Sequence, residues 1–235
     1  MHTRSSLKLN KRLSAIRDLV TDDYAHIWDC CCDHGHLGAS LLDSRPKAQV
    51  HFVDLVDELI LNLGEKLAQY YPLTDYNWLT HCLDLCDLNL SPYPGKHLLV
   101  IAGVGGELCA KFVSAIVKSN PNADIEFLLC PVHHQFELRS QLIELKLGLL
   151  HEALILENNR FYEILWVNKL EHSSQVSCTI TDVGVDIWQE NASISATQIN
   201  RYMDKTLQHY QRKQLENKAK ISPIIAAYQS IRLKD

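Results

Sequence analysis

The sequence predicts an α/β protein whose mostly parallel sheet ends in an antiparallel hairpin and is followed by helices. Short apolar runs alternate with segments of helical periodicity from residue 26 to about residue 147, which is typical of a parallel sheet covered by helices. Two strand-like runs then meet at a pair of asparagines, and a polar tail with helical periodicity follows. The 235 residues, 46% hydrophobic and 22% charged, suffice for one full domain with an appendage.

A short basic helix is expected at the start of the chain. Leu13, Ile16 and Val20 recur at helical spacing, with lysines and arginines between them. We expect the apolar stripe to pack on the sheet domain and the charges to face outward. Lys11 and Arg12 are therefore early candidates for contact with a polyanion.

The alternating middle of the chain predicts five strands and four helices that cover them. The apolar runs are short and rich in β-branched or aromatic residues, as buried strands are. The predicted strands are His26–Cys32, Gln49–Asp54, Trp78–Leu83, His97–Gly103 and Ile125–Pro131. The predicted helices cover residues 36–44, 56–70, 105–119 and 134–147.

A hairpin is expected directly after this alternation. Gly148 is predicted to end the last of the four helices. The runs Leu149–Glu157 and Arg160–Val167 then flank Asn158-Asn159, a pair that tolerates the left-handed conformations of a tight turn. A parallel sheet with an antiparallel edge is common, so this shape alone does not decide a function.

The tail after about residue 170 has no strand pattern and predicts two helices. One long helix is expected over Asn191–Lys220. Ser222-Pro223 is a suitable cap and first-turn pair for a second helix, which would pack on the first as an antiparallel hairpin with a basic outer face. We therefore predict a domain over residues 1–170 and a helical domain over residues 171–235.

Charge is distributed unevenly along the chain. Residues 1–20 carry five basic residues against one acid, residues 201–235 carry eight against three, and the residues between them carry ten against twenty-four. The net charge of -5 thus hides an acidic body with two basic ends. Such asymmetry favours contact with a polyanion such as a nucleic acid.

The chain is expected to be cytoplasmic. No apolar run approaches the roughly 20 residues of a membrane span, and the first ten residues lack the apolar core of a signal peptide. The eight cysteines include three consecutive ones, Cys30, Cys31 and Cys32, and most of the others lie in apolar runs. Free buried thiols in a reducing compartment are the better interpretation of this pattern.

Acidic residues at strand ends are the first candidates for a binding site. In open α/β sheets ligands bind beyond the carboxyl ends of the strands. The first strand contains Asp29, and the second ends at Asp54, 25 residues later, where a carboxylate can accept both hydroxyl protons of a ribose. Asp84 ends the third strand and is placed to meet an adenine amino group. An exposed acid at a strand end is the structural alternative for each.

Glycines cluster where the fourth strand ends. Gly103, Gly105 and Gly106 permit close approach of the backbone to a ligand. The cluster lacks the spacing of a phosphate loop, which argues against a nucleotide triphosphatase.

Two other kinds of chemistry are considered. Twelve histidines invite a metal site, but none of them forms a recognised zinc spacing, and we expect no metal. A nucleophilic cysteine enzyme is conceivable with Cys31 or Cys130 near His34 or His133. A run of three cysteines that ends a central strand is more often packed against neighbouring elements.

Taken together, these segments resemble the bacterial tRNA (adenine-22-N1)-methyltransferases, a family of class I S-adenosylmethionine-dependent methyltransferases with a Rossmann-like sheet. The segments that carry the resemblance are "KLNKRL", "IWDCCCDHGHLG", "HFVDLV", "VIAGVGG", "LLCP" and "LRSQLIELKLGLLHEALILENNRFYEILWV". Asp-His after the first strand and Ile-Ala-Gly-x-Gly-Gly after the fourth are the specific pieces. The chain departs from the family at Cys31, where a glycine is usual, and at Cys130-Pro131-Val132, where Gln-Pro-Asn is usual.

The resemblance implies methyl transfer from S-adenosylmethionine to N1 of an adenine in tRNA. It implies Asp33 as the carboxylate that stabilises the cationic product ring, with His34 orienting it or sharing that role. The residues implied to bind the cofactor are Asp29, Cys31, Gly35, Leu37, Asp54, Leu55, Asp84, Leu85, Ala102 and Gly103. The residues implied to bind the RNA are Lys11, Arg12, Gly105, Gly106, Pro131, His133, Arg212 and Lys213.

Two alternative functions remain open at this point. One is a methyltransferase of the same fold that acts on another RNA or on a small molecule, which the departures at Cys31 and Val132 favour. The other is an RNA-binding protein without catalytic activity on a degenerate methyltransferase fold. The sequence leaves the oligomeric state undetermined.

Overall fold

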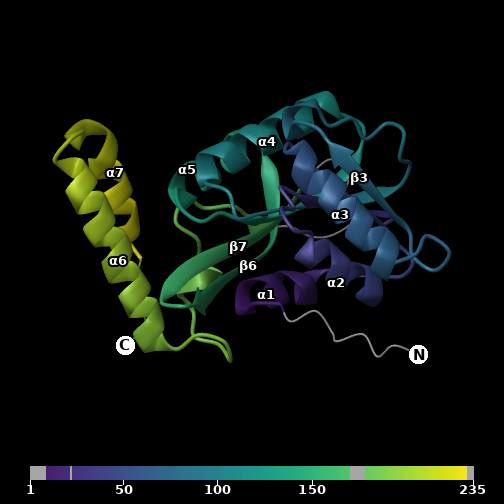
Figure 1. Cartoon of the computed structure of the whole chain (residues 1–235). Helices are drawn as coiled ribbons and strands as arrows, with labels where there is room; N and C mark the ends of the chain where they lie inside the picture. The colour runs from purple at the N-terminus through teal and green to yellow at the C-terminus, as the bar shows by residue number, and fades with distance from the viewer. Residues whose placement is uncertain (1–8, 22, 170–177, 232–235) are drawn as a thin grey trace.

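The computed structural model describes residues 9–21, 23–169 and 178–231, and these residues form a sheet of eight strands with helices around it (Figure 1). The strands are β1 (His26–Cys30), β2 (Gln49–Asp54), β3 (Trp78–Cys82), β4 (Lys96–Ala102), β5 (Asp124–Cys130), β6 (Leu147–Glu157), β7 (Arg160–Lys169) and β8 (Cys178–Thr179). The α-helices are α1 (Lys11–Leu19), α2 (His36–Ser44), α3 (Asp57–Tyr70), α4 (Gly106–Ser119), α5 (Gln135–Glu144), α6 (Ala196–Gln214) and α7 (Lys218–Gln229). Two 3₁₀ turns, η1 (Leu85–Asp87) and η2 (Asp186–Trp188), complete the elements.

The strand order is β3-β2-β1-β4-β5-β7-β6-β8. The strands β1 to β5 pair in parallel, and β7 lies antiparallel between β5 and β6. The predicted parallel sheet with an antiparallel hairpin is therefore confirmed. Because the chain starts at the centre and runs first to one side and then to the other, the carboxyl ends of β1 and β4 lie side by side at the switch point, where ligands bind in such sheets.

Helices cover both faces of the sheet. Side chains of α1, α2 and α3 pack in one apolar cluster with one face of the strands, and side chains of α4 and α5 pack in a second cluster with the other face. Figure 1 shows α4 and α5 on one side of the sheet and α1 and α2 on the opposite side. Both faces of the parallel strands are therefore buried, which explains their continuous apolar sequences.

The predicted basic helix at the start of the chain is α1. The Asn10 side chain caps it by accepting a 2.8 Å hydrogen bond from the Leu13 amide. Ile16 and Val20 are completely buried against the sheet domain, as the apolar stripe predicted. The Arg12 amide donates to a Glu157 carboxylate oxygen at 3.2 Å, which attaches the helix to the end of β6.

The predicted hairpin turn is also confirmed, but the helix before it ends differently. Asn158 and Asn159 both have positive φ angles, 47° and 63°, as a tight turn between β6 and β7 requires. Gly148 does not end a helix, because β6 begins at Leu147 and contains it. Lys146, with a φ of 54°, makes the left-handed turn after α5 instead.

Two helices follow in the tail, with boundaries that differ from the prediction. The expected single helix over residues 191–220 is wrong, because α6 begins only after Ser195, which forms a capping box with Gln198, and ends at Gln214. The Asn217 side chain accepts from the Lys220 amide and begins α7 there. The predicted start at Ser222-Pro223 is therefore also wrong.

Pro223 lies inside α7, where it cannot donate to the carbonyl of Ala219 one turn earlier. Ala219 is exposed, so solvent can reach that carbonyl. The predicted antiparallel packing of the two helices is confirmed (Figure 1), and the Gln214 side chain donates to the Ser222 hydroxyl across them at 2.9 Å.

The predicted domain boundary at residues 170 and 171 lies outside the described residues. The described chain resumes with β8, a strand of two residues on β6 that the sequence did not indicate. No helix of the described residues is long and apolar enough to cross a membrane.

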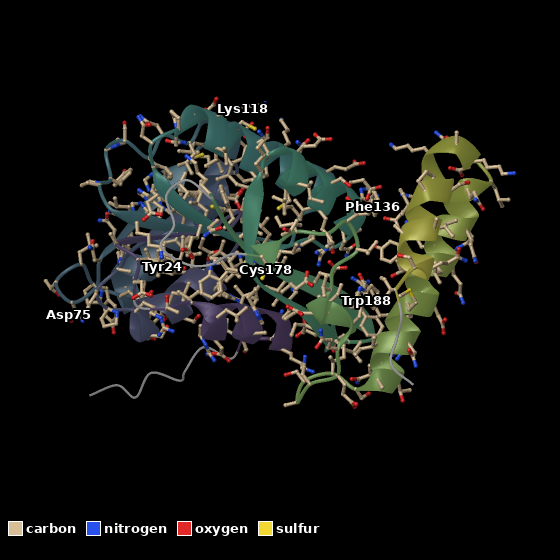
Figure 2. All side chains as sticks on the ribbon, turned by 180° about the vertical axis from the view of Figure 1, so that it is seen from behind. Tyr24, Asp75, Lys118, Phe136, Cys178 and Trp188 are labelled. Atoms are coloured by element: carbon tan, nitrogen blue, oxygen red, sulfur yellow. The ribbon has the colours of Figure 1, made fainter. Side chains whose placement is uncertain are left out.

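Aromatic packing and a buried ion cluster join the helical hairpin of α6 and α7 to the sheet. Figure 2 shows Phe136, from the sheet side, and Trp188 at this junction. The Trp188 ring stacks on Tyr202 of α6, and Phe136 packs against Tyr210 of α6 and Tyr228 of α7.

The ion cluster is centred on Arg139. Its guanidinium is fully buried and bonds Glu163 at 2.8 Å and Glu152 at 2.7 Å. The Tyr202 hydroxyl donates to Glu163 at 2.6 Å. Four elements, α5, β6, β7 and α6, therefore meet in one hydrogen-bonded network.

Candidate functional site

A cavity of about 330 Å³ opens beyond the carboxyl ends of β1 and β4. The turn after β1, the start of α1 and the glycine-rich turn after β4 line it. Its lining residues are Arg12, Leu13, Asp29, Cys31, Cys32, Asp33, His34, His36, Leu37, Ala102, Gly103 and Val104. Eight of the twenty residues that the sequence singled out for binding or catalysis, Arg12 among them, thus meet in one place.

Asp29 lies at the floor of this cavity. One of its carboxylate oxygens accepts a 2.8 Å hydrogen bond from the Gly38 amide in the first turn of α2. Burial has a larger effect on the pKa of Asp29 than this hydrogen bond, which lowers it. Desolvation raises the pKa of Asp29 to about 7. Asp29 is thus a buried acceptor that connects the end of β1 to the start of α2.

Asp54, at the end of β2, is hydrogen-bonded to the turn between β1 and α2. One carboxylate oxygen accepts from the Asp33 amide at 3.1 Å and the other from the Val56 amide at 3.1 Å. The carboxylate is partly exposed, so lone pairs remain for a ligand. Leu55, next in the chain, has 67% of its surface exposed.

The turn between β1 and α2 has a left-handed backbone. Cys31 has a φ of 56°, Asp33 of 51° and Gly35 of 65°. Cys31 therefore adopts, as a non-glycine residue, a conformation that glycine adopts more readily. Its half-buried thiol lines the cavity, and burial raises the pKa of Cys31 to about 11.

Asp33 and His34 lie at the mouth of the cavity. Both side chains are mostly exposed, and a carboxylate oxygen of Asp33 lies 3.6 Å from Nδ1 of His34. The buried Gly35 follows and caps α2, and a Cβ there would lie 2.7 Å from a methyl group of Leu63. The turn therefore presents one carboxylate and one imidazole toward the cavity opening.

The glycine-rich turn after β4 packs on the loop after β5. The Gly103 amide, at a φ of 94°, donates to the Cys130 carbonyl, and the Gly106 amide donates to the His133 carbonyl at 2.8 Å. A Cβ on Gly105 would lie 2.3 Å from the His133 ring. The predicted residues Gly105, Gly106, Pro131 and His133 are thus neighbours at the edge of the cavity.

The predicted cofactor residues Asp84 and Leu85 follow β3, the strand next to β2 in the sheet. Asp84 caps η1 by accepting from the Cys86 amide at 2.9 Å, and that bond lowers the pKa of Asp84. Leu85 is buried in the apolar cluster under α4. Neither residue lines the cavity at β1 and β4.

The four predicted RNA-contacting cations lie on two helices, α1 and α6. Arg12 lies in the cavity wall, with its guanidinium 5.1 Å from the Tyr162 ring and a buried Nη1 that has no hydrogen-bond partner among the described residues. Lys11 is exposed on α1. On α6, Arg212 is exposed and the Lys213 ammonium lies 3.5 Å from Nε2 of His134.

The chemistry of the cavity does not favour metal or thiolate catalysis. Among the described residues, no three His, Cys, Asp or Glu side chains are grouped as metal ligands would be. Burial raises the pKa of the Cys130 thiol to about 11, as it does for Cys31, so both thiols are protonated at neutral pH. The side chains that can bind a polar ligand there are the guanidinium of Arg12, the carboxylates of Asp29 and Asp33, and the imidazoles of His34 and His36.

Comparison with known families decides the class of protein. Residues 9–165 match the model of a family described as a methyltransferase domain, which covers α1, the parallel strands and most of the hairpin. The chain belongs to this methyltransferase family. The cavity lies inside the matched region, whereas α6 and α7 lie beyond it.

Relatives and solved structures agree with this assignment. A Mycoplasma genitalium protein named "Putative tRNA methyltransferase" is 25% identical over 182 residues, which cover 75% of this chain and 77% of that protein. The Bacillus subtilis m1A22 tRNA methyltransferase TrmK matches in structure with a TM-score of 0.69 and 18% identity, over 95% of this methyltransferase and 98% of that chain. The Mycoplasma capricolum TrmK in complex with S-adenosyl-homocysteine matches with a TM-score of 0.71 and 16% identity, over 94% and 96%.

The solved structures show that the whole architecture recurs, helical hairpin included. Four lining residues of this methyltransferase's cavity are not among the predicted site residues: Leu13, Cys32, His36 and Val104. Leu13 was assigned to the apolar stripe of α1, and only the packing of α1 beside the switch point brings it there. His36 follows His34 by two residues, which was a weak but available signal.

Proposed function

We propose that this methyltransferase transfers the methyl group of S-adenosylmethionine to N1 of adenine 22 in tRNA. The observation that carries the proposal is the cavity at β1 and β4, where a buried nitrogen of Arg12 without a partner in the described part of the chain lines the same wall as the carboxylates of Asp29 and Asp33. The names of relatives and solved neighbours supply the substrate: the two Mycoplasma relatives are named putative tRNA methyltransferases, and the Bacillus subtilis neighbour is an m1A22 tRNA methyltransferase.

The residues present fit the proposed cofactor. S-adenosylmethionine carries an α-carboxylate on its methionine part, a ribose diol on its adenosine part, and an electrophilic methyl group on the sulfur between these parts. The unpartnered Nη1 of Arg12 suits the carboxylate, and the free lone pairs of Asp54 suit the ribose hydroxyls. Asp29 holds the amino-terminal turn of α2 in place between them.

The proposed reaction needs no covalent intermediate on the enzyme. Adenine N1 has an in-plane lone pair, so the protein aligns that nitrogen with the methyl carbon and keeps water out. N1 lies on the Watson–Crick edge, so the base must be turned out of its paired or tertiary-folded position.

Methylation leaves a positive charge on the adenine ring. The Asp33 carboxylate, at the mouth of the cavity, is placed to stabilise that charge and to accept a proton from N6. His34, 3.6 Å away, is placed to orient the carboxylate. Asp33 is the proposed catalytic residue, and His34 is the proposed positioning residue.

Purified protein, labelled S-adenosylmethionine and unmodified tRNA test the proposal. We expect 1-methyladenosine at position 22 after nuclease digestion, and none when that adenine is replaced by guanosine. The Asp33→Asn variant should lower kcat by about 10²- to 10⁴-fold while S-adenosylmethionine still binds. If no tRNA accepts label, the proposal is wrong; if S-adenosylmethionine does not bind but tRNA does, the protein is an RNA-binding protein without catalytic activity.

A further inference from the structure

A second cavity, of about 310 Å³, lies where the sheet meets the helical hairpin. The loop after β5, the turn of the β6–β7 hairpin, α6 and α7 all contribute to its wall. We call it the junction cavity. Its volume falls within the range of roughly 300–1,000 Å³ that is typical of small-molecule sites.

The junction cavity is next to the proposed cofactor cavity. Val104 lines the cofactor cavity and Val132 lines the junction cavity, and a 2.9 Å backbone hydrogen bond joins these two residues. Arg12 of the cofactor cavity also lies over the ring of Tyr162, which lines the junction cavity. One strand of RNA can therefore place neighbouring nucleotides in the two cavities.

The wall of the junction cavity is aromatic and basic, and it contains no Asp or Glu. The His133 ring is exposed yet held in place, because it packs on the His134 ring at 4.3 Å and lies against Gly105. Fixed aromatic rings, histidine included, are the surfaces on which unpaired RNA bases stack.

Cations at the rim have room for a phosphate. The Lys205 ammonium donates to the Asn159 carbonyl at 3.1 Å and has two further N–H donors. Within the described residues no carboxylate lies within 4 Å of Lys205 or of Arg160, the other cation in the wall. Both are therefore available to an anion.

The same charges argue against the target adenine as the occupant. The adenine becomes cationic on methylation, and a wall with Lys205, Arg160 and no carboxylate would repel the product ring. Asp33, which can stabilise that ring, lines the other cavity. A nucleotide whose base stays neutral matches the junction cavity better, because its base is not repelled by the cations and its phosphate can bind to them at the rim.

We propose that the junction cavity holds a nucleotide that flanks the target adenine, stacked on His133 with its phosphate on Lys205. This inference rests on the proposed function, because it requires an RNA substrate. It makes α6 and α7 one wall of a nucleotide site.

Substrate RNAs that lack one base at a time test the inference with the full-length protein. Each tRNA of a series contains a single abasic site, either at the target position or at one of the positions up to two nucleotides before or after it. The Kd of each tRNA is measured by fluorescence anisotropy. For the wild type, one flanking abasic site should weaken binding by about 5- to 150-fold, the loss expected for one stacked base. For His133→Ala, the same abasic site should change the Kd by less than about twofold.

Two further variants distinguish binding of a base in the junction cavity from general electrostatic attraction of the RNA. Thr206→Trp fills the cavity from its half-buried wall and should also remove the sensitivity to that flanking base. Lys220→Ala, on α7 outside the cavity, should weaken binding of all the RNAs equally and keep the sensitivity.

The outcomes distinguish this inference from the proposed function. If the wild type methylates tRNA but His133→Ala keeps the wild-type sensitivity, or only the target position is sensitive, the junction cavity does not hold a flanking nucleotide. If the wild type neither binds nor methylates tRNA, both proposals are wrong.

Discussion

At the scale of single residues, Asp54 connects two strand ends and leaves lone pairs for a ligand. We expect Asp54→Asn to weaken S-adenosylmethionine binding by about 10- to 100-fold, because a hydrogen bond to a charged acceptor is worth about 1.5–3 kcal/mol. Isothermal titration calorimetry measures this affinity. Asp57→Asn, in the exposed first turn of α3, is the matched control and should bind like the wild type. Equal affinity of Asp54→Asn and wild type would show that the ribose lies elsewhere.

Cys31 is a second residue whose backbone can be tested. Glycine adopts the φ of 56° found at Cys31 at no steric cost, whereas a residue with a β-branched side chain adopts it only with strain. Cys31→Gly should therefore change the free energy of unfolding by less than about 1 kcal/mol, whereas Cys31→Val should lower it by about 1–3 kcal/mol. Urea denaturation gives both values, and a loss in Cys31→Gly as large as in Cys31→Val would contradict the backbone explanation.

At the scale of elements, four neighbouring strands carry three buried histidines, His26, His51 and His97, and the half-buried His81. Nδ1 of His26 lies 3.0 Å from Nε2 of His51, and Nδ1 of His51 lies 2.9 Å from Nε2 of His81, across β1, β2 and β3. The Trp28 indole donates to Nδ1 of His97 on β4 at 3.1 Å. Burial is the main cause that lowers all four pKa values, to about 2 for His51 and about 4 for His97.

These histidines should make the fold sensitive to acid. In the unfolded chain a histidine binds a proton near pH 6.5, whereas in the folded chain His51 and His97 stay neutral to much lower pH. Below pH 6.5 the unfolded state therefore binds more protons, and the free energy of unfolding should fall as the pH falls. The expected slope is at most about 1.4 kcal/mol per pH unit for each of the two, from about pH 6 to pH 4.

Urea denaturation at several pH values measures this slope. His51→Gln keeps a hydrogen-bonding side chain that cannot be protonated, so it should reduce the slope. His151→Gln changes an exposed histidine and serves as the control. A slope equal in His51→Gln and wild type would exclude the buried chain as its source.

The elements themselves were largely predictable from the sequence, because continuous apolar runs and helical stripes follow directly from burial on two faces of a parallel sheet. The predicted strand His97–Gly103 differs from β4 by one residue at each end. The errors lie where a local signal was ambiguous. Gly148 suggested a helix end, but Lys146 accepts the left-handed conformation two residues earlier. The stripe in 191–220 concealed the cap at Asn217, since polar residues are also frequent on exposed helix faces.

The candidate site was predictable where strand ends determine it, and less so where distant segments meet. Asp29 and Asp33 share one cavity with Gly103 because β1 and β4 are neighbours, as their order in the chain implied. The position of Arg12 depends on how α1 packs, which no local pattern specifies. The junction cavity was not predicted, because it requires α6 to lie against the β6–β7 turn.

At the scale of the whole molecule, the Arg139 network determines how the helical hairpin is attached. Arg139→Leu should lower the free energy of unfolding by about 3–5 kcal/mol, because it leaves Glu152 and Glu163 buried without their partner. Chemical denaturation measures the loss. Arg160→Leu, at an exposed position, should cost less than about 1 kcal/mol. A similar small loss in Arg139→Leu would show that the carboxylates are compensated in another way.

The fold places the basic residues at the two ends of the chain in different surroundings. Among the basic residues of α1 and α6, Arg12 lines the cofactor cavity, whereas Lys213 lies beside His134 of the junction cavity. Under the proposed function, Arg12 holds the cofactor and the cations of α6 hold a segment of RNA, and the acidic residues of the sheet domain limit non-specific binding.

The position of β7 between β5 and β6 determines when the sheet can be completed during synthesis. The free edge of β5 cannot acquire its native partner until residues 160–169 have left the ribosome, although every parallel strand has been made by then. A nascent chain that is stalled before that point exposes an apolar strand edge, the type of edge at which chains aggregate. Arrest of translation after β5 has left the ribosome, but before residues 160–169 have done so, should therefore be the stage at which this protein depends most on chaperones.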